Sequence, residues 1–253
     1  MVNIAISTIC DMVTHCRIRL DDVSPVATIP ITNQELIDAA AEEADESELL
    51  WTEAELRHYA NEAIKEVAIR TLCIRDSGRN EAGLTLYPIT SPANTITVDR
   101  RVLVIKRVWW NDTVLRAESE KFLDEAENPA SAGSWRTDTT DEPRQFVLER
   151  ASRQLQLVGL PTVDGNIKLD IVRLPLETLE TGTPEIPQYY LSDCLDWMCH
   201  LAYLKNDADT KDTKQAANFS AMFTGKVGPR PTDLLIELDY HQAGRRRPRL
   251  YYY

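Results

Sequence analysis

The spacing of apolar residues changes twice along this chain, and this change constrains the fold more than any single motif. Over residues 6–72 apolar side chains recur every three or four positions, which is typical of amphipathic helices. From residue 84 to residue 174 they mostly alternate with polar ones, as in half-buried strands. Helical spacing returns over residues 191–223. This order predicts an α+β protein whose two helical sections pack into one bundle around an inserted β section.

The changes of period predict four sections in the 253 residues. Residues 1–81 and 176–228 are expected to form the helical bundle. Residues 82–175 are expected to form an inserted antiparallel β lobe. The last section, residues 229–253, carries no periodicity strong enough to fold alone, so we expect an extended C-terminal arm.

Two Thr-x-x-Glu sequences predict helix starts, because the threonine and glutamate side chains bond reciprocally to free backbone N–H groups. Thr32 with Glu35 predicts a helix in the N-terminal section. Thr52 with Glu55 predicts the longest helix, which keeps one apolar face for about five turns. The sequence Asp76–Gly78 has the composition of a turn and is expected to end that helix.

The β section is expected to begin at Leu84–Ile89 and to continue with a short strand over Thr95–Val98. A long β-branched strand over Val102–Trp110 and a tight turn at Asn111–Asp112 follow. A short helix is expected around Glu118–Glu125. Residues 128–142 are rich in Ser, Thr, Asp, Gly and Pro, which predicts a surface loop.

Two later segments alternate strictly and predict a hairpin. They are Gln154–Leu157 and Asn166–Ile171, with the turn signal Asp164–Gly165 between them. Asp207–Thr210 is expected to end the helix that follows, and Thr210 is expected to be the N-cap of the last helix.

The five cysteines are odd in number and scattered, which argues against a disulfide framework and agrees with a reducing compartment. The grouping of Cys194, Cys199 and His200 lacks the cysteine spacing of zinc sites. On one helix the two cysteines would lie about 140° apart. We therefore expect buried cysteines that act as small hydrophobes, no metal and no cofactor.

Catalytic motifs do not stand out in the sequence. It has neither a Gly-x-Ser-x-Gly elbow nor a glycine-rich phosphate loop, and its four histidines are isolated from one another. We therefore expect no enzymatic activity. Two alternatives stay open: an intracellular DNA-binding or regulatory protein, and an unrecognised hydrolase. The first needs a basic recognition face, which the net charge of −12 disfavours, and the second needs convergent polar groups.

Charge is distributed unevenly between the two ends of the chain. Residues 21–55 carry eleven acidic side chains and no Lys or Arg, whereas residues 240–253 carry four Arg and no acid. This asymmetry predicts that the ends meet different partners, against the alternative of a solvated helix face and a frayed tail. Arg and Tyr suit protein interfaces and also nucleic acid. The arm residues of interest are Arg245, Arg246, Arg247, Arg249, Tyr251, Tyr252 and Tyr253.

Apolar runs stay short of the ~18 residues that a membrane span needs, and the N-terminus lacks the pattern of a signal peptide. We therefore expect no membrane contact and a protein that is made and used without secretion.

Several segments resemble the head-to-tail adaptor (connector, or head completion) proteins of tailed bacteriophages. The resemblance covers about residues 50–225 and rests on packing and turn signatures rather than on catalytic motifs. The segments are Leu50–Leu56 with Tyr59, Asn61, Glu62 and Ala63, Val102–Val108, Ile171–Leu176, Pro184–Pro187, Leu195–Trp197, Ala202–Tyr203 and Asp207–Thr210.

This resemblance implies a structural virion protein at the head–tail junction, made in the host cytoplasm. Such adaptors form a ring, commonly of twelve copies, beneath the portal protein. The ring joins the capsid to a tail protein, either nozzle or tube, and continues the channel for double-stranded DNA, which passes without sequence-specific binding. By analogy the C-terminal arm would dock on the portal.

The charge map adds a hypothesis about the channel. If the acidic N-terminal segment lines it, negative charge would repel the passing DNA and let it slide. The residues concerned are Glu42, Glu43, Asp45 and Glu46.

Overall fold

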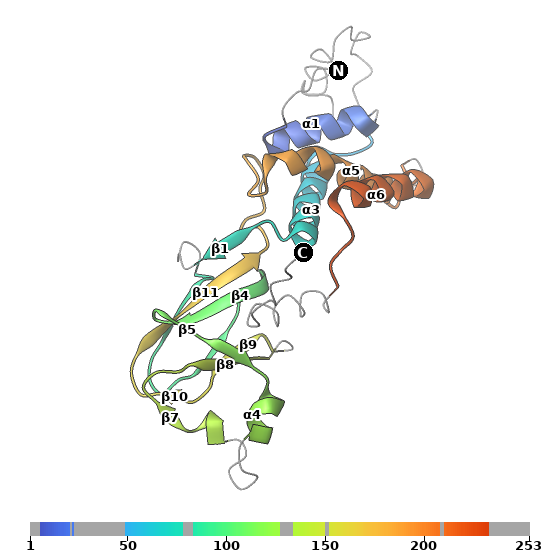
Figure 1. Cartoon of the computed structure of the whole chain (residues 1–253). Helices are drawn as coiled ribbons and strands as arrows, with labels where there is room; N and C mark the ends of the chain where they lie inside the picture. Colours follow the sequence, from blue (N-terminus) through green and yellow to red (C-terminus); the bar gives the residue numbers. More distant parts are fainter. Residues whose placement is uncertain are drawn as a thin grey trace, which may run out of the picture. The chain divides into compact units, whose positions relative to one another are not determined.

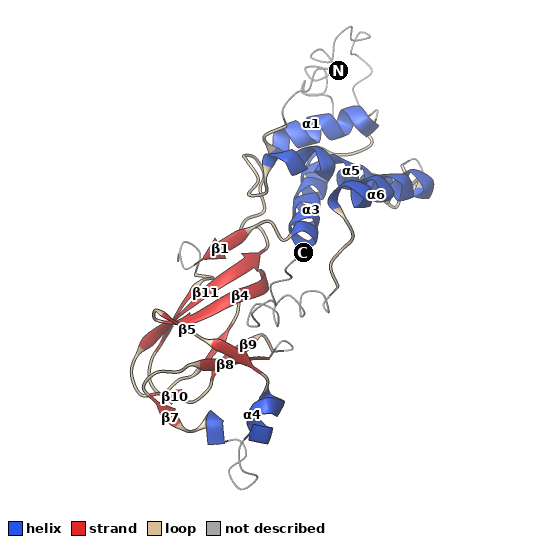
Figure 2. Cartoon of the chain, in the orientation of Figure 1, coloured by secondary structure: helices blue, strands red, loops and turns tan. Residues whose placement is uncertain are grey.

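The computed structural model describes residues 6–20, 22, 49–77, 83–126, 134–149, 152–207 and 210–232. Contacts divide the chain into two compact units. Described residues up to 74 and from 175 to 230 form the helical unit, and those of 75–174 together with residues 231–232 belong to the β unit. All described strands lie in the β unit (Figure 2). The fold is therefore of mixed helix and strand content, while the predicted boundaries at residues 81 and 175 stay predictions.

The helical unit contains four main helices from both ends of the chain. They are α1 (Ile9–Leu20), α3 (Glu53–Thr71), α5 (Leu191–Tyr203) and α6 (Thr213–Val227) (Figure 1). Helix α5 is central, since it packs against each of the other three. Its apolar face is fully buried, so helices that are distant in sequence share one core.

The predicted capping box at the start of α3 is confirmed. Thr52 Oγ1 accepts a hydrogen bond from the Glu55 amide, and Glu55 Oε2 accepts one from the Thr52 amide at 2.9 Å. The helix ends at Leu72, whose backbone is left-handed with φ of 52°. The predicted turn at residues 76–78 is wrong in its described part, because Arg75–Ser77 forms strand β1. The helix expected after Thr32 lies outside the described residues.

The predicted cap of the last helix is also wrong. Helix α6 starts after Asp212, whose Oδ1 accepts hydrogen bonds from the Lys214 and Gln215 amides at 2.9 and 3.1 Å. Thr210 is instead buried. A carboxylate in the cap position also interacts favourably with the positive end of the helix dipole, which favours Asp212 over the earlier threonine.

The main sheet of the β unit is built on β11 (Gly165–Arg173) (Figure 1). One edge of β11 pairs with β4 (Val102–Trp110), which continues through the predicted tight turn to β5 (Thr113–Val114). The other edge pairs with β1 and with β2 (Leu86–Ile89). All these pairs are antiparallel, and the predicted strand over residues 102–110 is confirmed.

The predicted hairpin between residues 154–157 and 166–171 is wrong. Strand β9 (Gln154–Leu157) belongs to a second sheet, in the order β3-β9-β8-β6. Its partners are β3 (Thr95–Thr97) and β8 (Gln145–Glu149), a strand that the sequence analysis missed. Strand β8 precedes β9 closely in the chain, so it pairs more readily than the later β11 does.

The β unit is not wholly antiparallel, which corrects the prediction. Strand β6 (Arg116–Glu118) pairs in parallel with β8, and β7 (Thr139–Thr140) pairs in parallel with β10 (Leu160–Pro161). The short helix α4 (Glu120–Ala126) lies where it was predicted.

The described part of the expected loop over residues 128–142 contains more order than its composition indicated. It holds β7 and the 3₁₀ helix η2 (Ser134–Arg136). Trp135 is buried in a small cluster with Leu123 and Val147, because burial of a large aromatic ring outweighs the polar character of its neighbours.

Candidate functional site

The residues that the sequence analysis singled out lie outside the described part of the chain. This holds for the acidic residues Glu42, Glu43, Asp45 and Glu46. It holds equally for the arm residues Arg245, Arg246, Arg247, Arg249 and Tyr251–Tyr253. The described residues instead show how both ends of the acidic segment, and the start of the C-terminal arm, are attached to the helical unit.

The acidic segment leaves and rejoins the helical unit at one point. The Leu50 amide donates to Asp22 Oδ1 at 3.0 Å, although the two residues are 28 positions apart. The Trp51 amide donates to Asp22 Oδ2 at 3.3 Å. One buried carboxylate therefore holds both ends of the segment between residues 23 and 49.

Arg17 of α1 and Trp51 connect Asp22 to helices α1 and α5 through hydrogen bonds. Arg17 Nη1 lies 3.0 Å from both Asp22 Oδ2 and the Trp51 carbonyl oxygen, and all three residues are buried. Trp51 Nε1 donates to the Ala202 carbonyl of α5 at 3.1 Å. The buried side chains of Arg17, Asp22 and Trp51 thus all have hydrogen-bond partners, as burial requires.

A buried carboxylate also joins three helices. Asp196 of α5 is fully buried, and its oxygens bind Arg19 of α1 and Lys226 of α6, the latter at 2.6 Å. Asp193 lies 3.8 Å from the same Lys226 amine. Burial raises the pKa of Asp193, while Lys226 opposes that rise. Two cations compensate the desolvated charge of Asp196 and fix the register of the three helices.

Arg70 fixes the end of α6. Its guanidinium donates to Glu66 at 2.7 Å and to the Gly228 carbonyl at 2.9 Å, and it lies over the rings of Trp197 and Phe223 at 5.1 and 4.8 Å. The chain is therefore anchored to α3 at the point where it departs toward the C-terminal arm.

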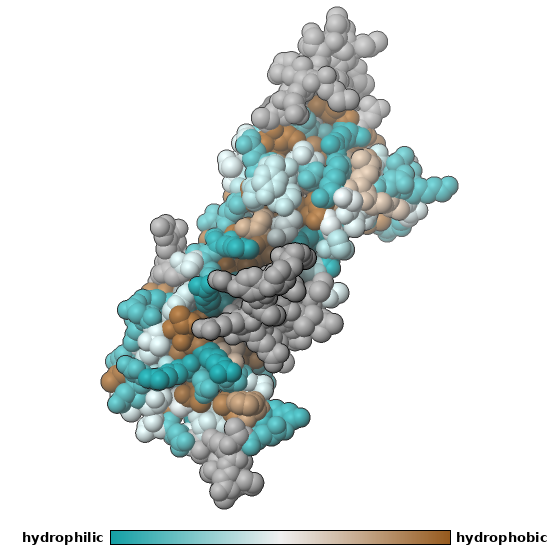
Figure 3. Space-filling view, in the orientation of Figure 1, coloured by the Kyte–Doolittle hydropathy of each residue, from teal (hydrophilic) through white to brown (hydrophobic). Residues whose placement is uncertain are grey.

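A shallow groove of about 590 Å³ runs between α5 and α6. Small residues such as Ala217 and Ala221 line it, together with Leu204, which is 44% exposed. In Figure 3 apolar and polar side chains are interspersed over this part of the surface. Exposed apolar side chains beside a groove are typical of surfaces that contact other proteins.

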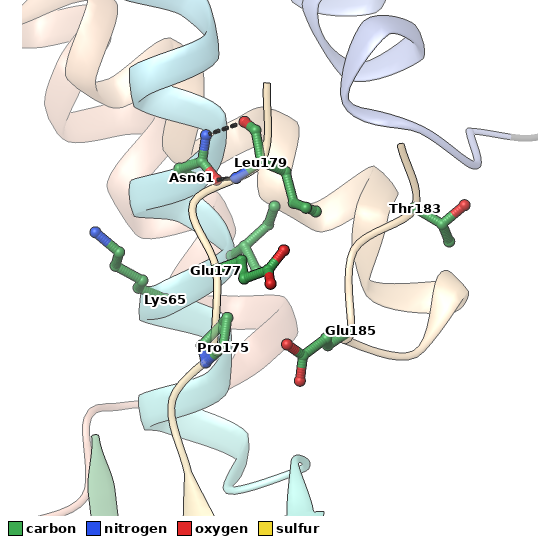
Figure 4. Close-up of a pocket in the computed structure, with 8 residues that line it drawn as sticks. Asn61, Lys65, Pro175, Glu177, Leu179, Thr183 and Glu185 are labelled. Atoms are coloured by element: carbon green, nitrogen blue, oxygen red, sulfur yellow. Dashed lines mark hydrogen bonds between the residues drawn. The ribbon is translucent and has the colours of Figure 1, made fainter. Parts of the chain in front are cut away.

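A second, more enclosed pocket of about 210 Å³ lies between α3 and residues 175–185 (Figure 4). Asn61 holds its wall: the side chain donates to the Leu179 carbonyl at 2.7 Å and accepts from the Leu179 amide at 2.9 Å. Glu177 and Glu185 point into the space between the two stretches of this segment, whereas the amine of Lys65 points away.

The expectation of buried cysteines is confirmed for three of the five and is wrong for Cys10, which is exposed, while Cys73 is half-buried. Cys16, Cys194 and Cys199 are fully buried, and burial raises the pKa of the Cys194 thiol. Cys16 Sγ lies 4.0 Å from Cys199 Sγ across α1 and α5. Within the described ranges, no three His, Cys, Asp or Glu side chains are grouped so that they would hold a metal ion.

Sequence reasoning missed the roles of Asn61 and Asp196, although it noted both residues. Each is a polar residue inside an otherwise apolar helix face, between Ala60 and Ala63 in one case and between Leu195 and Trp197 in the other. A polar residue at such a position needs a buried partner, and this was the available signal.

These features define the class of the protein as an interaction protein. Its helical unit presents a groove and a pocket. Asp22 and Arg70 of this unit bind the chain where the acidic segment rejoins it and where the C-terminal arm departs. The model of the SU10 adaptor protein family matches residues 31–252, and the chain belongs to this family. It is a phage structural adaptor protein, a component of the virion that interacts with other phage structural proteins. The predicted resemblance to phage adaptors is confirmed at this level.

No curated protein matches the chain significantly. In the part of the chain that the structure describes, none of the helices has the length and apolar character to cross a membrane.

Proposed function

We propose that this protein is a head-to-tail adaptor. Twelve copies form a ring beneath the portal, join the capsid to a nozzle or tube protein of the tail, and continue the channel for double-stranded DNA. The observation that carries the proposal is the match to the adaptor family over residues 31–252. Ring contacts are heterologous, with two different faces of each copy, and the two units offer distinct faces.

The proposed work of this protein is binding, without a catalytic step. Its location is the head–tail junction of the virion, after synthesis in the host cytoplasm. The family match supports a structural role, and the groove and the pocket of the helical unit supply surfaces for contacts with neighbouring chains.

Co-sedimentation with portal rings tests the proposal. The purified chain is titrated onto rings, and the mass of the complex is measured. We expect saturable binding that ends at twelve copies per ring. Absence of saturable binding, with DNA-filled capsids as well as with isolated rings, would contradict it. Salt-dependent binding of the free chain to duplex DNA would then favour the DNA-binding alternative.

The C-terminal arm is proposed to dock on the portal. A variant in which Arg245, Arg246, Arg247 and Arg249 become Gln should bind rings at least about tenfold more weakly, because Arg residues are frequent interface anchors. The matched control changes four exposed cations elsewhere to Gln: Arg116, Lys121, Lys211 and Lys214. Equal weakening by both variants would dismiss a specific role of the arm.

The acidic segment is proposed to line the channel. Replacement of Glu42, Glu43, Asp45 and Glu46 by Lys should slow DNA ejection, because the reversed charges attract phosphate. The same four positions changed to neutral amides should give an intermediate rate. The kinetics of DNA ejection from reconstituted particles measure both effects. Unchanged kinetics with the Lys variant would contradict the proposal that the acidic segment lines the channel.

A further inference from the structure

Two cysteine side chains meet where helix α1 packs against helix α5. Cys16 Sγ lies 4.0 Å from Cys199 Sγ, and both residues are fully buried free cysteines. A disulfide bond is about 2.05 Å long, so the two sulfurs need to approach each other by about 2 Å. A shift of about 1 Å by each sulfur is within the reach of side-chain rotation.

An ion pair close to the two cysteines holds the same two helices together. Arg19 follows Cys16 by three positions, and its partner Asp196 precedes Cys199 by three. Because residues three apart lie on the same face of a helix, the ion pair and the two sulfurs belong to one contact between α1 and α5. The ion pair therefore limits how far the two sulfurs can move apart.

The other three cysteines are placed less favourably for such a bond. Cys10 is exposed, and Cys73 is half-buried and lies beyond the end of α3. Cys194 is fully buried on α5, but it points about 140° away from Cys199 around that helix. The geometry thus favours one pair among the five cysteines.

We propose that Cys16 and Cys199 form a disulfide bond in oxidising surroundings, which a virion component meets when the particle leaves the cell. The bond would join residues 183 positions apart, and so it would connect the two parts of the helical unit that the β unit separates. Arg17 is next to Cys16 and binds Asp22, where the acidic segment is attached. The bond therefore also fixes this attachment.

The oxidant of this step is a peroxide. One cysteine thiolate attacks an oxygen of H₂O₂, the O–O bond breaks, and a sulfenic acid and hydroxide form; the hydroxide takes up the proton that this thiol had lost. The second thiol then attacks the sulfenic sulfur, so that the S–S bond forms, the S–O bond breaks, and the departing hydroxide leaves with the second proton as water. Two thiols and one peroxide thus give one disulfide and two waters, and the two sulfurs supply the two electrons.

The reaction should be slow in the folded protein. The hydrogen bond between the two thiols and their burial raise the pKa of the Cys16 thiol, which lowers the concentration of the reactive thiolate. We therefore expect the free thiols to persist in the reducing cell and the bond to form during longer exposure to the oxidant.

Peptide mapping of the full chain tests the proposal without any substitution. The chain is purified with a reductant, treated with H₂O₂ after its removal, and digested under non-reducing conditions. Mass spectrometry should find a linked peptide pair that contains Cys16 and Cys199. In concentrated urea the same treatment should favour Cys10 with Cys16, because that pair closes a far shorter loop. Absence of the Cys16–Cys199 pair from the folded chain, or the same pairs with and without urea, would overturn the proposal.

Thermal unfolding tests whether the bond holds α1 to α5. Oxidation should raise the midpoint of unfolding by about 5–15 °C, because a disulfide constrains the unfolded chain, and a reductant should reverse the rise. Cys199→Ala should abolish the rise, whereas the control Cys10→Ala, at an exposed position of α1, should keep it. An unchanged midpoint after oxidation, or an equal rise in Cys199→Ala, would contradict the proposed bond. Neither result would bear on binding to portal rings.

Discussion

Single residues hold the helical unit together where charges are buried. Asp196 is the strongest case, because one fully buried carboxylate serves cations from two other helices. Asp22 pairs with one cation, Arg17, and accepts the Leu50 amide where the acidic segment rejoins the helical unit. At such sites the cost of desolvation is recovered only if every partner is present.

Asp196→Asn should destabilise the helical unit by about 2–3 kcal/mol, since it weakens two charge-assisted hydrogen bonds. Arg19 and Lys226 are 35% and 42% exposed in their side chains, so water compensates part of the loss. Denaturant unfolding measures the change. Asp193→Asn is the control, because Asp193 contacts only the edge of this network at 3.8 Å and should cost far less. Equal effects would contradict the assignment.

Substitution by alanine should change the free energy of unfolding in opposite directions at two glycines. A Cβ at Gly165 would lie 2.6 Å from Cη2 of Trp110, so Gly165→Ala should cost about 1–3 kcal/mol through overpacking of the β unit. At Gly225 in α6 a Cβ meets nothing within 4 Å, so Gly225→Ala should stabilise by up to about 1 kcal/mol. Thermal unfolding followed by tryptophan fluorescence reports both, and the same sign for both would be inconsistent with these environments.

Among the elements, α3 shows how local sequence and tertiary contacts act together. Its N-terminus is capped by Thr52 and Glu55, as the sequence predicts, and Lys205 from beyond α5 also binds Glu55 at 3.0 Å. Burial alone would raise the pKa of Glu55, but the hydrogen bonds from Thr52 and Lys205 outweigh it and lower the pKa.

Glu55 therefore contributes stability above its ordinary pKa of 4.5, and this contribution disappears as pH falls through the lower pKa of the folded state. Glu55→Gln should cost about 1 kcal/mol at pH 7, the usual value of a helix cap. The difference from the unmodified chain should shrink in acid, as urea unfolding between pH 7 and pH 3 would show. A difference that is constant with pH would rule out the charged form of Glu55 as its source.

Elements defined by local signals were predictable, whereas their pairings were not. The capping box of α3 and the strand Val102–Trp110 were found because neighbouring residues specify them. The alternation of residues 154–157 fits either sheet equally well, so it could not show that β9 pairs with β8. The role of Asp196 was hidden for the same reason, because Arg19 lies 177 positions away.

For the whole molecule, the main consequence is that the helical unit is assembled from both ends of the chain. Its helices α1 and α3 precede the β unit, and α5 and α6 follow it. Core residues such as Met12 and Met198 are therefore separated by the entire β unit. In contrast, the strand pairs of the β unit that the structure describes all join residues of 75–174.

A fragment of residues 75–174 should fold alone, with a strand-type circular dichroism spectrum and a cooperative thermal transition. A fragment of residues 1–74 should not fold alone, because the apolar faces of α1 and α3 that pack against α5 would be exposed to water. Joining residues 1–74 to 175–230 with a flexible linker should restore helicity and serves as the positive control. A cooperative transition in the 1–74 fragment would disprove the dependence on α5.

The hydrogen bond between the Leu50 amide and Asp22 determines where new sequence can be inserted into this protein. Because residues 22 and 50 meet at one carboxylate, the distance between the two ends of this segment does not depend on its length. Doubling such a loop adds only about 0.6 kcal/mol of closure cost. Epitopes or small fluorescent domains inserted between residues 23 and 49 should therefore be tolerated. This segment is thus a suitable insertion site for labels.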